Sequence, residues 1–303
     1  MNSNVAGREE RALSFQELAT EIHKYYVLEH VDRGSETVVV VFSHAPRPAL
    51  RQYEFRYDCL YVTDRKLFYY LHNPGRQALL LQRFIDQAGY KTAIFLGLSK
   101  GGVGSLLWSS LIFRRDAQFR IFCLAFSPQT LLYPFNDNLT SLPSYLSNLR
   151  IAEGNDRHRK NFETYGNLPE FVEGLLPPTM IVFSSKNSMD RVEAQRLAGE
   201  SSVVLKPLEM EFHGSITPFV IDRRRSRSLK RLAAKLYADA ERDIDLKAML
   251  PPTQKQFLSD FDQRRLKCPS LNALIDDFCG FEPLVEVDRW HFLRRWLPFA
   301  RFE

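Results

Sequence analysis

The sequence predicts an α/β fold with a doubly wound, mostly parallel sheet. Short runs of β-branched and aromatic residues alternate with stretches of helical periodicity over about 200 residues. Runs without polar interruption are typical of strands buried on both faces. The chain has 303 residues, of which 45% are hydrophobic, which is enough to bury a core of this kind. In such a sheet, right-handed crossovers bring ligand sites to the carboxyl ends of the strands.

The individual elements follow from apolar runs that end at turn residues. Six runs predict strands, at residues 37–42, 59–62, 92–96, 120–126, 179–184 and 203–208. Helical spacing of apolar residues predicts helices at 77–88, 103–113 and 190–198, and residues 14–28 form a short helical or irregular segment. Asp190 stands where it could cap the last of these helices.

The predicted sheet divides the chain into three parts. Residues 1–35 form an N-terminal segment, 36–236 the core, and 237–303 a C-terminal helical extension packed on the core. Within the core, the pattern loosens over residues 133–175, which contain several prolines and asparagines. This stretch predicts a loose insertion, either helical or shaped as a cap.

Charge and cysteine content exclude several classes of function. The net charge of +5 is mildly basic, and no aromatic residues alternate with the basic ones, so we expect no nucleic-acid partner. Four widely spaced cysteines without a C-x-x-C pair predict neither a metal site nor a redox site, and no cofactor is expected. The sequence has no apolar signal core and no run long enough for a transmembrane segment, so we expect a cytoplasmic protein.

The positive charge is concentrated in one run, which has two interpretations. Its arginines are Arg223, Arg224, Arg225 and Arg227. The first interpretation is a solvated helix face. The second is a site for an anionic partner, such as a phosphorylated carrier, a membrane surface or an acidic glycan.

A glycine-flanked serine lies between a predicted strand and a predicted helix. The residues Gly97-Leu98-Ser99-Lys100-Gly101 follow the strand at 92–96. Such a turn is so tight that Cβ atoms at the flanking positions would clash, and it leaves the serine hydroxyl exposed at the start of the helix. The spacing does not fit a phosphate-binding loop, since Lys100 precedes the glycine pair.

A serine nucleophile needs a base and an acid, which follow it in the chain in the order acid, then histidine. His213 directly follows the last predicted strand, and Gly214 lets the loop turn sharply. Asp190 follows the strand at 179–184 and is the leading candidate for the acid. Glu193 and Asp137 are the alternatives for the acid. A solvent-exposed loop histidine and a helix-capping aspartate are the structural alternatives for His213 and Asp190.

Two backbone N–H groups are expected to form an oxyanion hole. One belongs to Lys100, the residue after the serine, and the other to Ser43 or His44, which end the strand at 37–42. We expect the Lys100 side chain to face solvent or to meet an anionic substrate.

With these motifs, the chain resembles the α/β-hydrolase superfamily over residues 36–236, with no subfamily assigned. The resemblance implies a triad of Ser99, His213 and Asp190 with Lys100 N–H in the oxyanion hole. It also implies a serine hydrolase that cleaves an ester or thioester through an acyl-enzyme on Ser99. The substrate expected of such an enzyme is a small molecule or a glycan acyl ester. One alternative is an acyltransferase that uses the same triad on a glycan or carrier-bound acyl group. The other is a non-catalytic binding scaffold.

Overall fold

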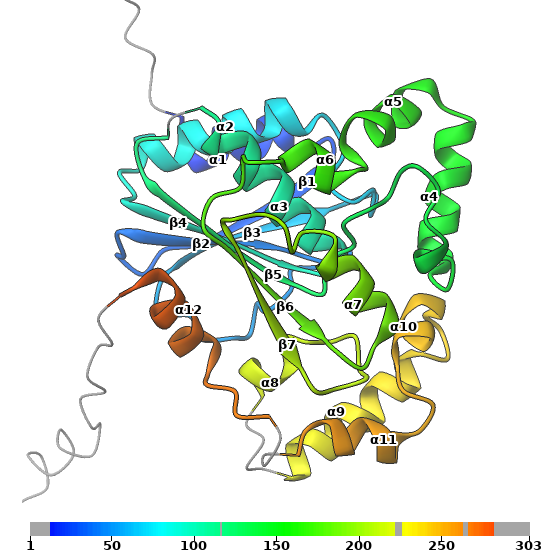
Figure 1. The fold of residues 1–303 in the computed structure, drawn as a ribbon. Coiled ribbons are helices and arrows are strands. Elements are labelled where there is room, and N and C mark those ends of the chain that lie inside the picture. Colours follow the sequence, from blue (N-terminus) through cyan, green and yellow to red (C-terminus); the bar gives the residue numbers. More distant parts are fainter. Residues whose placement is uncertain (1–12, 116, 222–225, 263–265, 282–303) are drawn as a thin grey trace, which may run out of the picture.

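The computed structural model describes residues 13–115, 117–221, 226–262 and 266–281. Within these ranges, seven strands form one sheet in the order β1-β3-β2-β4-β5-β6-β7 (Figure 1). β1 pairs antiparallel with β3, and every other neighbouring pair is parallel. The strands are β1 (Tyr26–Val31), β2 (Thr37–Phe42), β3 (Asp58–Asp64), β4 (Thr92–Leu98), β5 (Arg120–Phe126), β6 (Thr179–Ser184) and β7 (Val203–Leu208).

The predicted α/β fold with a mostly parallel sheet is confirmed. The bounds of β2, β5, β6 and β7 agree with the predicted runs, whereas β3 and β4 are longer than predicted. Alternating side chains of β2 enter two different cores. Val38 and Val40 pack on one face of the sheet, and Val39 and Val41 on the other. Both faces are therefore covered, which explains the unbroken apolar composition of the strand.

The N-terminal segment contains a strand that the sequence did not predict. Helix α1 (Phe15–Ile22) begins with a capping box, in which Ser14 and Glu17 bond reciprocally. β1 follows and forms the edge of the sheet beside β3. Its polar residues Glu29 and His30 break the apolar pattern, because an edge strand is only partly covered. The prediction of a helical or irregular segment over 14–28 was therefore wrong at its C-terminal end.

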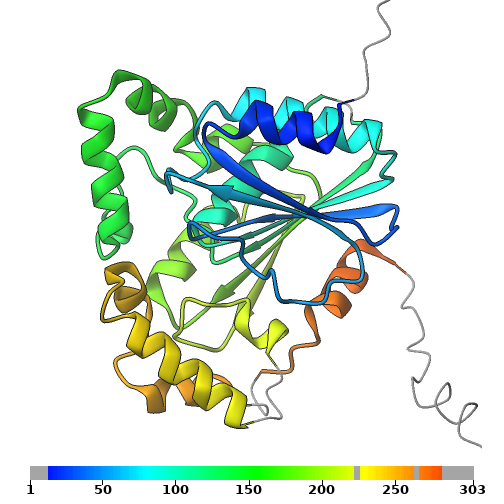
Figure 2. The ribbon, with the colours of Figure 1, turned by 180° about the vertical axis from the view of Figure 1, so that it is seen from behind.

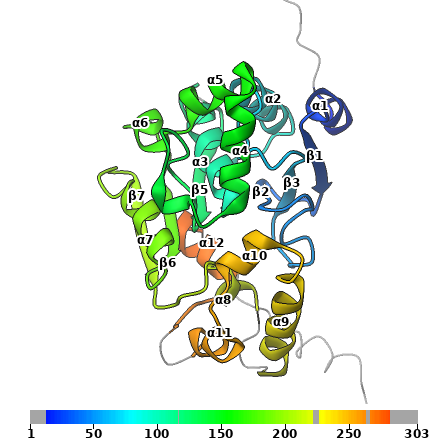
Figure 3. The same ribbon diagram turned by 90° about the vertical axis from the view of Figure 1, so that its right-hand side faces the viewer.

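Helices cover both faces of the sheet. On one face lie α1, α2 (Pro74–Gln87), α3 (Lys100–Phe113) and α7 (Ser188–Gln195), and on the other α8 (Thr217–Val220), α9 (Ser226–Asp239), α11 (Gln254–Asp260) and α12 (Leu271–Cys279). Figures 2 and 3 show α1 and α2 on one side of the strands and α9 and α11 on the other. α10 (Ile244–Met249) joins α9 to α11. Within the described ranges, no helix combines the length and apolarity needed to span a bilayer.

The loose insertion between β5 and β6 is helical. It contains η1 (Asp137–Leu139), α4 (Pro143–Glu153), α5 (Asp156–Tyr165) and α6 (Leu168–Val172). In the C-terminal part, α9 runs across the boundary expected between residues 236 and 237. Of the extension expected over 237–303, residues 263–265 and 282–303 lie outside the described residues.

Candidate active site

Ser99 is the one residue between β4 and α3, and its backbone is strained. Its φ of 51° and ψ of −115° are uncommon for a residue with a side chain. Two hydrogen bonds hold this conformation. The N–H of Ser99 donates to the carbonyl of Phe126 at 2.8 Å, and its carbonyl accepts from Gly102 N–H at 2.8 Å. The turn thus fixes the hydroxyl at the start of α3.

The two flanking glycines are required by contact with backbone atoms. A Cβ on Gly97 would lie 2.2 Å from the carbonyl oxygen of Gly101, and a Cβ on Gly101 would lie 2.1 Å from that of Phe42. Real Cβ atoms do not approach so closely. The predicted need for glycine at both positions is confirmed, and it allows α3 to pack directly on β4 and on the end of β2.

The structure brings Ser99, His213 and Asp190 together in one hydrogen-bonded chain. His213 Nε2 lies 2.8 Å from Ser99 Oγ, and His213 Nδ1 lies 2.5 Å from Asp190 Oδ1. All three side chains are buried. The serine follows β4, the aspartate lies on α7 after β6, and the histidine follows β7, so parallel strands deliver them to the same edge of the sheet.

Further hydrogen bonds orient Asp190 toward the histidine. Ser127 Oγ donates to the second carboxylate oxygen, Oδ2, at 2.5 Å, and Ser215 Oγ lies 2.9 Å from Ser127 Oγ. The N-cap of α7 is Asn187, whose side chain accepts from the N–H of Asp190. Asp190 therefore does not cap the helix, and its carboxylate is available to His213.

The loop that carries His213 is held by the C-terminal helices. Asp260, the last residue of α11, accepts hydrogen bonds through Oδ2 from the backbone N–H groups of Glu211 at 2.9 Å and Phe212 at 2.8 Å. Ser184 Oγ donates to the carbonyl of Phe212 at 2.5 Å. Sequence reasoning missed Asp260, because it stands 47 positions after His213 in a helix with no motif.

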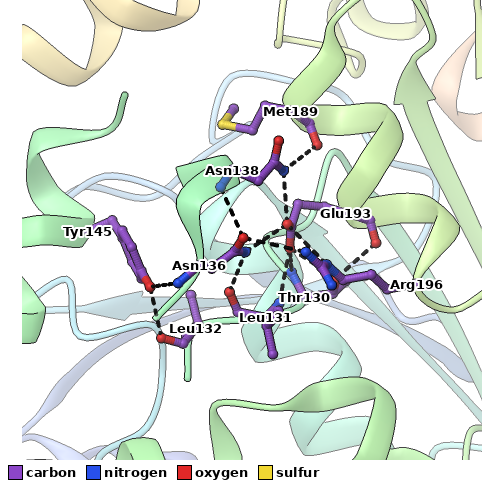
Figure 4. Close-up of polar contacts among 9 residues, drawn as sticks. All are labelled: Thr130, Leu131, Leu132, Asn136, Asn138, Tyr145, Met189, Glu193 and Arg196. Atoms are coloured by element: carbon purple, nitrogen blue, oxygen red, sulfur yellow. Dashed lines mark hydrogen bonds and ion pairs between the residues drawn. The ribbon is translucent and has the colours of Figure 1, made fainter. Parts of the chain in front are cut away.

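The two alternative acids lie elsewhere. Glu193 lies on α7, and Figure 4 shows its buried carboxylate against the loop that follows β5, where it accepts from Thr130 N at 2.8 Å and Leu131 N at 3.0 Å. This side chain is fully used in holding that loop. Asp137 is exposed at the start of η1, and no described hydrogen bond joins it to His213. Neither residue takes the place of Asp190.

A buried amide that the sequence did not single out also contacts Ser99. Gln129 is 1% exposed, and its Nε2 donates to Ser99 Oγ at 3.2 Å. It follows Ser127-Pro128 at the end of β5, the neighbour of β4 in the sheet. A polar residue just beyond the carboxyl end of a neighbouring strand was the signal that could have identified it.

Of the two candidates for the second oxyanion donor, one is already engaged. The N–H of Ser43 donates to the carbonyl of Val62 at 3.1 Å, as an extension of the β2–β3 ladder, so it is not available to a substrate. The N–H of His44 donates to no described acceptor. Lys100 is the first residue of α3, where a backbone N–H has no partner in the helix. The remaining candidates for the two backbone donors of the oxyanion hole are therefore the N–H groups of Lys100 and His44.

The side chain of Lys100 is buried, which corrects the expectation that it faces solvent or an anionic substrate. Its Nζ forms an ion pair with Asp245 Oδ2 of α10 at 2.8 Å. Asp245 Oδ1 accepts from Ser144 N–H of α4 at 2.9 Å. Burial alone would raise the pKa of Asp245, but the ammonium of Lys100 and the bonds from Ser144 bring it below its ordinary value.

A cavity of about 520 Å³ opens at the serine and has a largely apolar wall. Helices α9 and α10 supply much of this wall, which sequence reasoning did not place at the site. Of the segment 133–175, only Ser144 lines the cavity. The apolar residues that line the cavity include Leu98, Phe126, Ile216, Leu232, Leu236 and Met249.

The remaining sequence predictions concern charged and metal-binding groups. Arg223, Arg224 and Arg225 lie outside the described residues, and Arg227 is exposed near the start of α9. Among the residues that the structure describes, no group of three or more His, Cys, Asp or Glu side chains could hold a metal ion.

Comparisons with known proteins found similarity in structure. No protein-family model matches the chain, and no curated protein sequence matches it. Carboxyl esterase 2 from the mycorrhizal fungus Tuber melanosporum is 16% identical over 78% of this chain and 83% of its own, with a TM-score of 0.47. A lipase-esterase related protein from Clostridium acetobutylicum is 13% identical over 62% and 92%, with a TM-score of 0.42.

A third solved structure is a capsule O-acetyltransferase. This protein of Neisseria meningitidis serogroup A, in complex with CoA, is 16% identical over 60% of this chain and 81% of its own, with a TM-score of 0.41. In the present chain, a serine turn joins the central strand β4 to α3, helices cover both faces of a mostly parallel sheet, and the aspartate and histidine follow the serine in that order. These features of the chain's own topology are those of the α/β-hydrolase fold.

Proposed function

We propose that this protein is a serine hydrolase that cleaves an ester or thioester through an acyl-enzyme on Ser99. One observation carries the proposal: the unbroken hydrogen-bond chain from Asp190 through His213 to Ser99 Oγ. A serine hydroxyl is nearly inert at neutral pH without an adjacent base, and an oriented imidazole supplies that base. The strained turn that exposes Ser99 to the cavity supports the same role.

In the proposed acylation step, His213 Nε2 takes the proton of Ser99 as Oγ attacks the substrate carbonyl. Asp190 holds the imidazole through Nδ1–H and stabilises its positive charge. The developing oxyanion accepts hydrogen bonds from the backbone N–H groups of Lys100 and His44. The protonated His213 then gives its proton to the departing alcohol or thiol.

Water completes the cycle by the same route. His213 takes a proton from a water molecule as that water attacks the acyl carbon, and the acid product leaves Ser99. The cavity lining also includes the charged residues Arg47, Asp239 and Asp243. Its apolar part suits the uncharged portion of an acyl group, because burying an unpaired charge against these side chains would cost free energy.

The two alternative functions receive less support from the geometry. An acceptor pocket built from residues 133–175 would favour acyl transfer, but Ser144 alone of that segment lines the cavity. A non-catalytic scaffold would be favoured by a His213 or Asp190 side chain that points away from Ser99. Instead, His213 lies within hydrogen-bonding distance of Ser99 Oγ, and Asp190 lies within hydrogen-bonding distance of His213. Hydrolysis is therefore the function proposed.

Labelling with a fluorophosphonate probe tests the proposal. We expect the native protein to be labelled, and Ser99→Ala to show no labelling above background. His213→Ala and Asp190→Asn should slow the labelling by about 10³- to 10⁴-fold, because the serine loses its base or the base its orientation. Ser110→Ala is the matched control, since Ser110 is a buried serine of α3 that does not line the cavity. Undiminished labelling of Ser99→Ala would refute the proposed nucleophile.

A further inference from the structure

Gln129 contacts the oxygen of Ser99 but not the space in which a substrate would lie. Its Nε2 is 3.2 Å from Ser99 Oγ, the side chain is 1% exposed, and it is not among the residues that line the cavity. An amide in this position cannot select an acyl group by direct contact. Whatever it contributes acts on the serine oxygen itself.

The protons of the site decide which atom of the amide faces Ser99. The carboxylate of Asp190 accepts the Nδ1 proton of His213, which leaves a lone pair on Nε2. Ser99 has one hydroxyl proton, and the 2.8 Å bond to Nε2 uses it. The serine oxygen can then offer only a lone pair to Gln129. The amide must therefore present its N–H group.

A network behind Gln129 fixes its backbone. The next two residues, Thr130 and Leu131, donate their N–H groups to Glu193 Oε2, and the side-chain amides of Asn136 and Asn138 donate to Oε1 at 2.9 Å each (Figure 4). Glu193 lies on α7, three residues after Asp190. One helix therefore supports both the candidate acid and the loop that carries the amide.

In the part of the chain that the structure describes, the amide oxygen of Gln129 does not contribute a hydrogen bond to the stability of the fold. Its Oε1 is buried and accepts no hydrogen bond from the described residues. A buried, unpaired acceptor lowers stability, whereas an apolar side chain of similar length would fill the same space without that cost. The contribution of Gln129 therefore comes from the N–H at Ser99.

We propose that Gln129 is a further catalytic residue that assists deacylation by donating a hydrogen bond to Ser99 Oγ as this oxygen leaves the acyl carbon. The proposal rests on the proposed function. Water adds to the acyl carbon and gives a proton to His213 Nε2. The bond from the acyl carbon to Oγ then breaks, Oγ takes that proton from Nε2, and the carboxylic acid departs. Oγ gains negative charge while the bond breaks, and the Gln129 N–H stabilises that charge.

Pre-steady-state hydrolysis of p-nitrophenyl acetate tests the proposal, with Gln129→Met as the variant of matched length. The burst of p-nitrophenolate reports acylation, and the steady rate reports deacylation when the acyl-enzyme accumulates. We expect the steady rate to fall about 10- to 100-fold, while the burst rate stays within about threefold of the native value. Intact-mass measurement should then show acetylated enzyme during turnover.

A second variant separates loss of a donor from loss of shape. Gln129→Glu keeps the size of the side chain but places a carboxylate acceptor against Oγ. This carboxylate competes with His213 for the serine proton, so we expect it to slow both the burst and the steady rate. Methionine at the same position should slow the steady rate alone.

Gln77→Met is the matched control, because Gln77 is also 1% exposed, also has an unpaired Oε1, and lies on α2 outside the cavity lining. Its kinetics should equal those of the native protein. If Gln129→Met keeps the native ratio of burst to steady rate, or slows both steps equally, the role of Gln129 is refuted while the proposed function stands. If Ser99→Ala still shows labelling and a burst, the proposed function itself is refuted.

Discussion

At the residue scale, the turn that carries Ser99 depends on the absence of Cβ atoms at Gly97 and Gly101. The atoms that a side chain would meet at Gly97 and Gly101 are carbonyl oxygens of Gly101 and Phe42, which belong to a helix and a strand and cannot rotate away. A flexible side chain could move to accommodate a methyl group, whereas these backbone atoms move only if α3 separates from the sheet. A side chain at either position would therefore both destabilise the protein and displace the turn that presents Ser99 to the cavity.

Gly97→Ala should consequently be strongly destabilising. We expect a loss of about 1–3 kcal/mol in the free energy of unfolding, because overpacking against rigid neighbours typically costs this amount. Gly199→Ala is the control, since nothing lies within 4 Å of a Cβ built there, and it should change the free energy by less than about 0.5 kcal/mol. Urea denaturation followed by circular dichroism measures both. Equal stabilities for the two variants would contradict the contact argument.

At the element scale, two short C-terminal helices each supply a carboxylate with little exposure to solvent. Asp245 of α10 pairs with Lys100, and Asp260 of α11 accepts the two N–H groups that precede His213. Phe257 of α11 also packs against Phe212, with ring centroids 5.0 Å apart. The helices after β7 are thus part of the candidate active site, and their removal would leave the His213 loop without these contacts.

Asp260→Ala should slow the proposed ester hydrolysis by about tenfold. Without the carboxylate that accepts from Glu211 and Phe212, the loop that carries His213 no longer holds the hydrogen-bond distance of 2.8 Å between His213 Nε2 and Ser99 Oγ. Asp260→Asn should retain activity, since its side-chain oxygen can accept the same N–H groups. Asp277→Ala, at an exposed position of α12, is the control. Loss of activity in the asparagine variant equal to that in the alanine variant would count against this role.

The charge of Asp260 gives the same pair of variants a second readout. Burial raises the pKa of Asp260 above its ordinary value, so ionisation of this carboxyl group opposes folding. Its contribution to stability is fully present below the unfolded pKa, where the group is protonated, and is lost as the pH rises through the folded pKa. At pH 8, the asparagine variant should therefore unfold at a temperature no lower than that of the native protein. A clear decrease in its melting temperature would contradict this sign.

The sequence allowed the prediction of elements whose pattern is local. β2 and β5 are unbroken apolar runs, and their pattern alone predicted them. Ser99, Asp190 and His213 each follow a strand, and their positions in the chain predicted that the three side chains would lie together. β1 escaped prediction because an edge strand may carry polar residues on both faces without penalty. Asp245 and Asp260 escaped it because an acid on an amphipathic helix looks alike whether it faces water or a buried partner, and only the path of the chain decides which.

At the scale of the whole molecule, the ion pair of Lys100 and Asp245 links the start of α3 to the helices that cover the cavity. Both side chains are largely buried, at 8% and 13% exposure, and Asp245 also binds the N–H of Ser144. Three segments far apart in the sequence thus meet at one carboxylate. Removing its charge leaves a buried ammonium without a partner, which is more costly than the loss of an exposed ion pair.

Asp245→Asn should therefore make stability depend less on pH. The pKa of Asp245 is lowered in the folded protein, so its contribution is present above its unfolded pKa of about 3.9 and is lost as the pH falls through the folded pKa. We expect the variant to be about 2–4 kcal/mol less stable at pH 7, with a difference that shrinks below about pH 4. Urea denaturation across this range measures it, with the exposed Asp239→Asn as control. A difference that is constant with pH would refute the assignment.

The contribution of α10 and α11 also has a consequence for the timing of activity during synthesis. A ribosome releases the polypeptide from its N-terminus onward, and the sheet can fold before the last helices have left the exit tunnel. Such a nascent chain already holds Ser99, Asp190 and His213, yet it lacks the carboxylates of residues 245 and 260. The full rate of the proposed hydrolysis would therefore be reached only when translation has passed α11, long after Ser99 itself has been made.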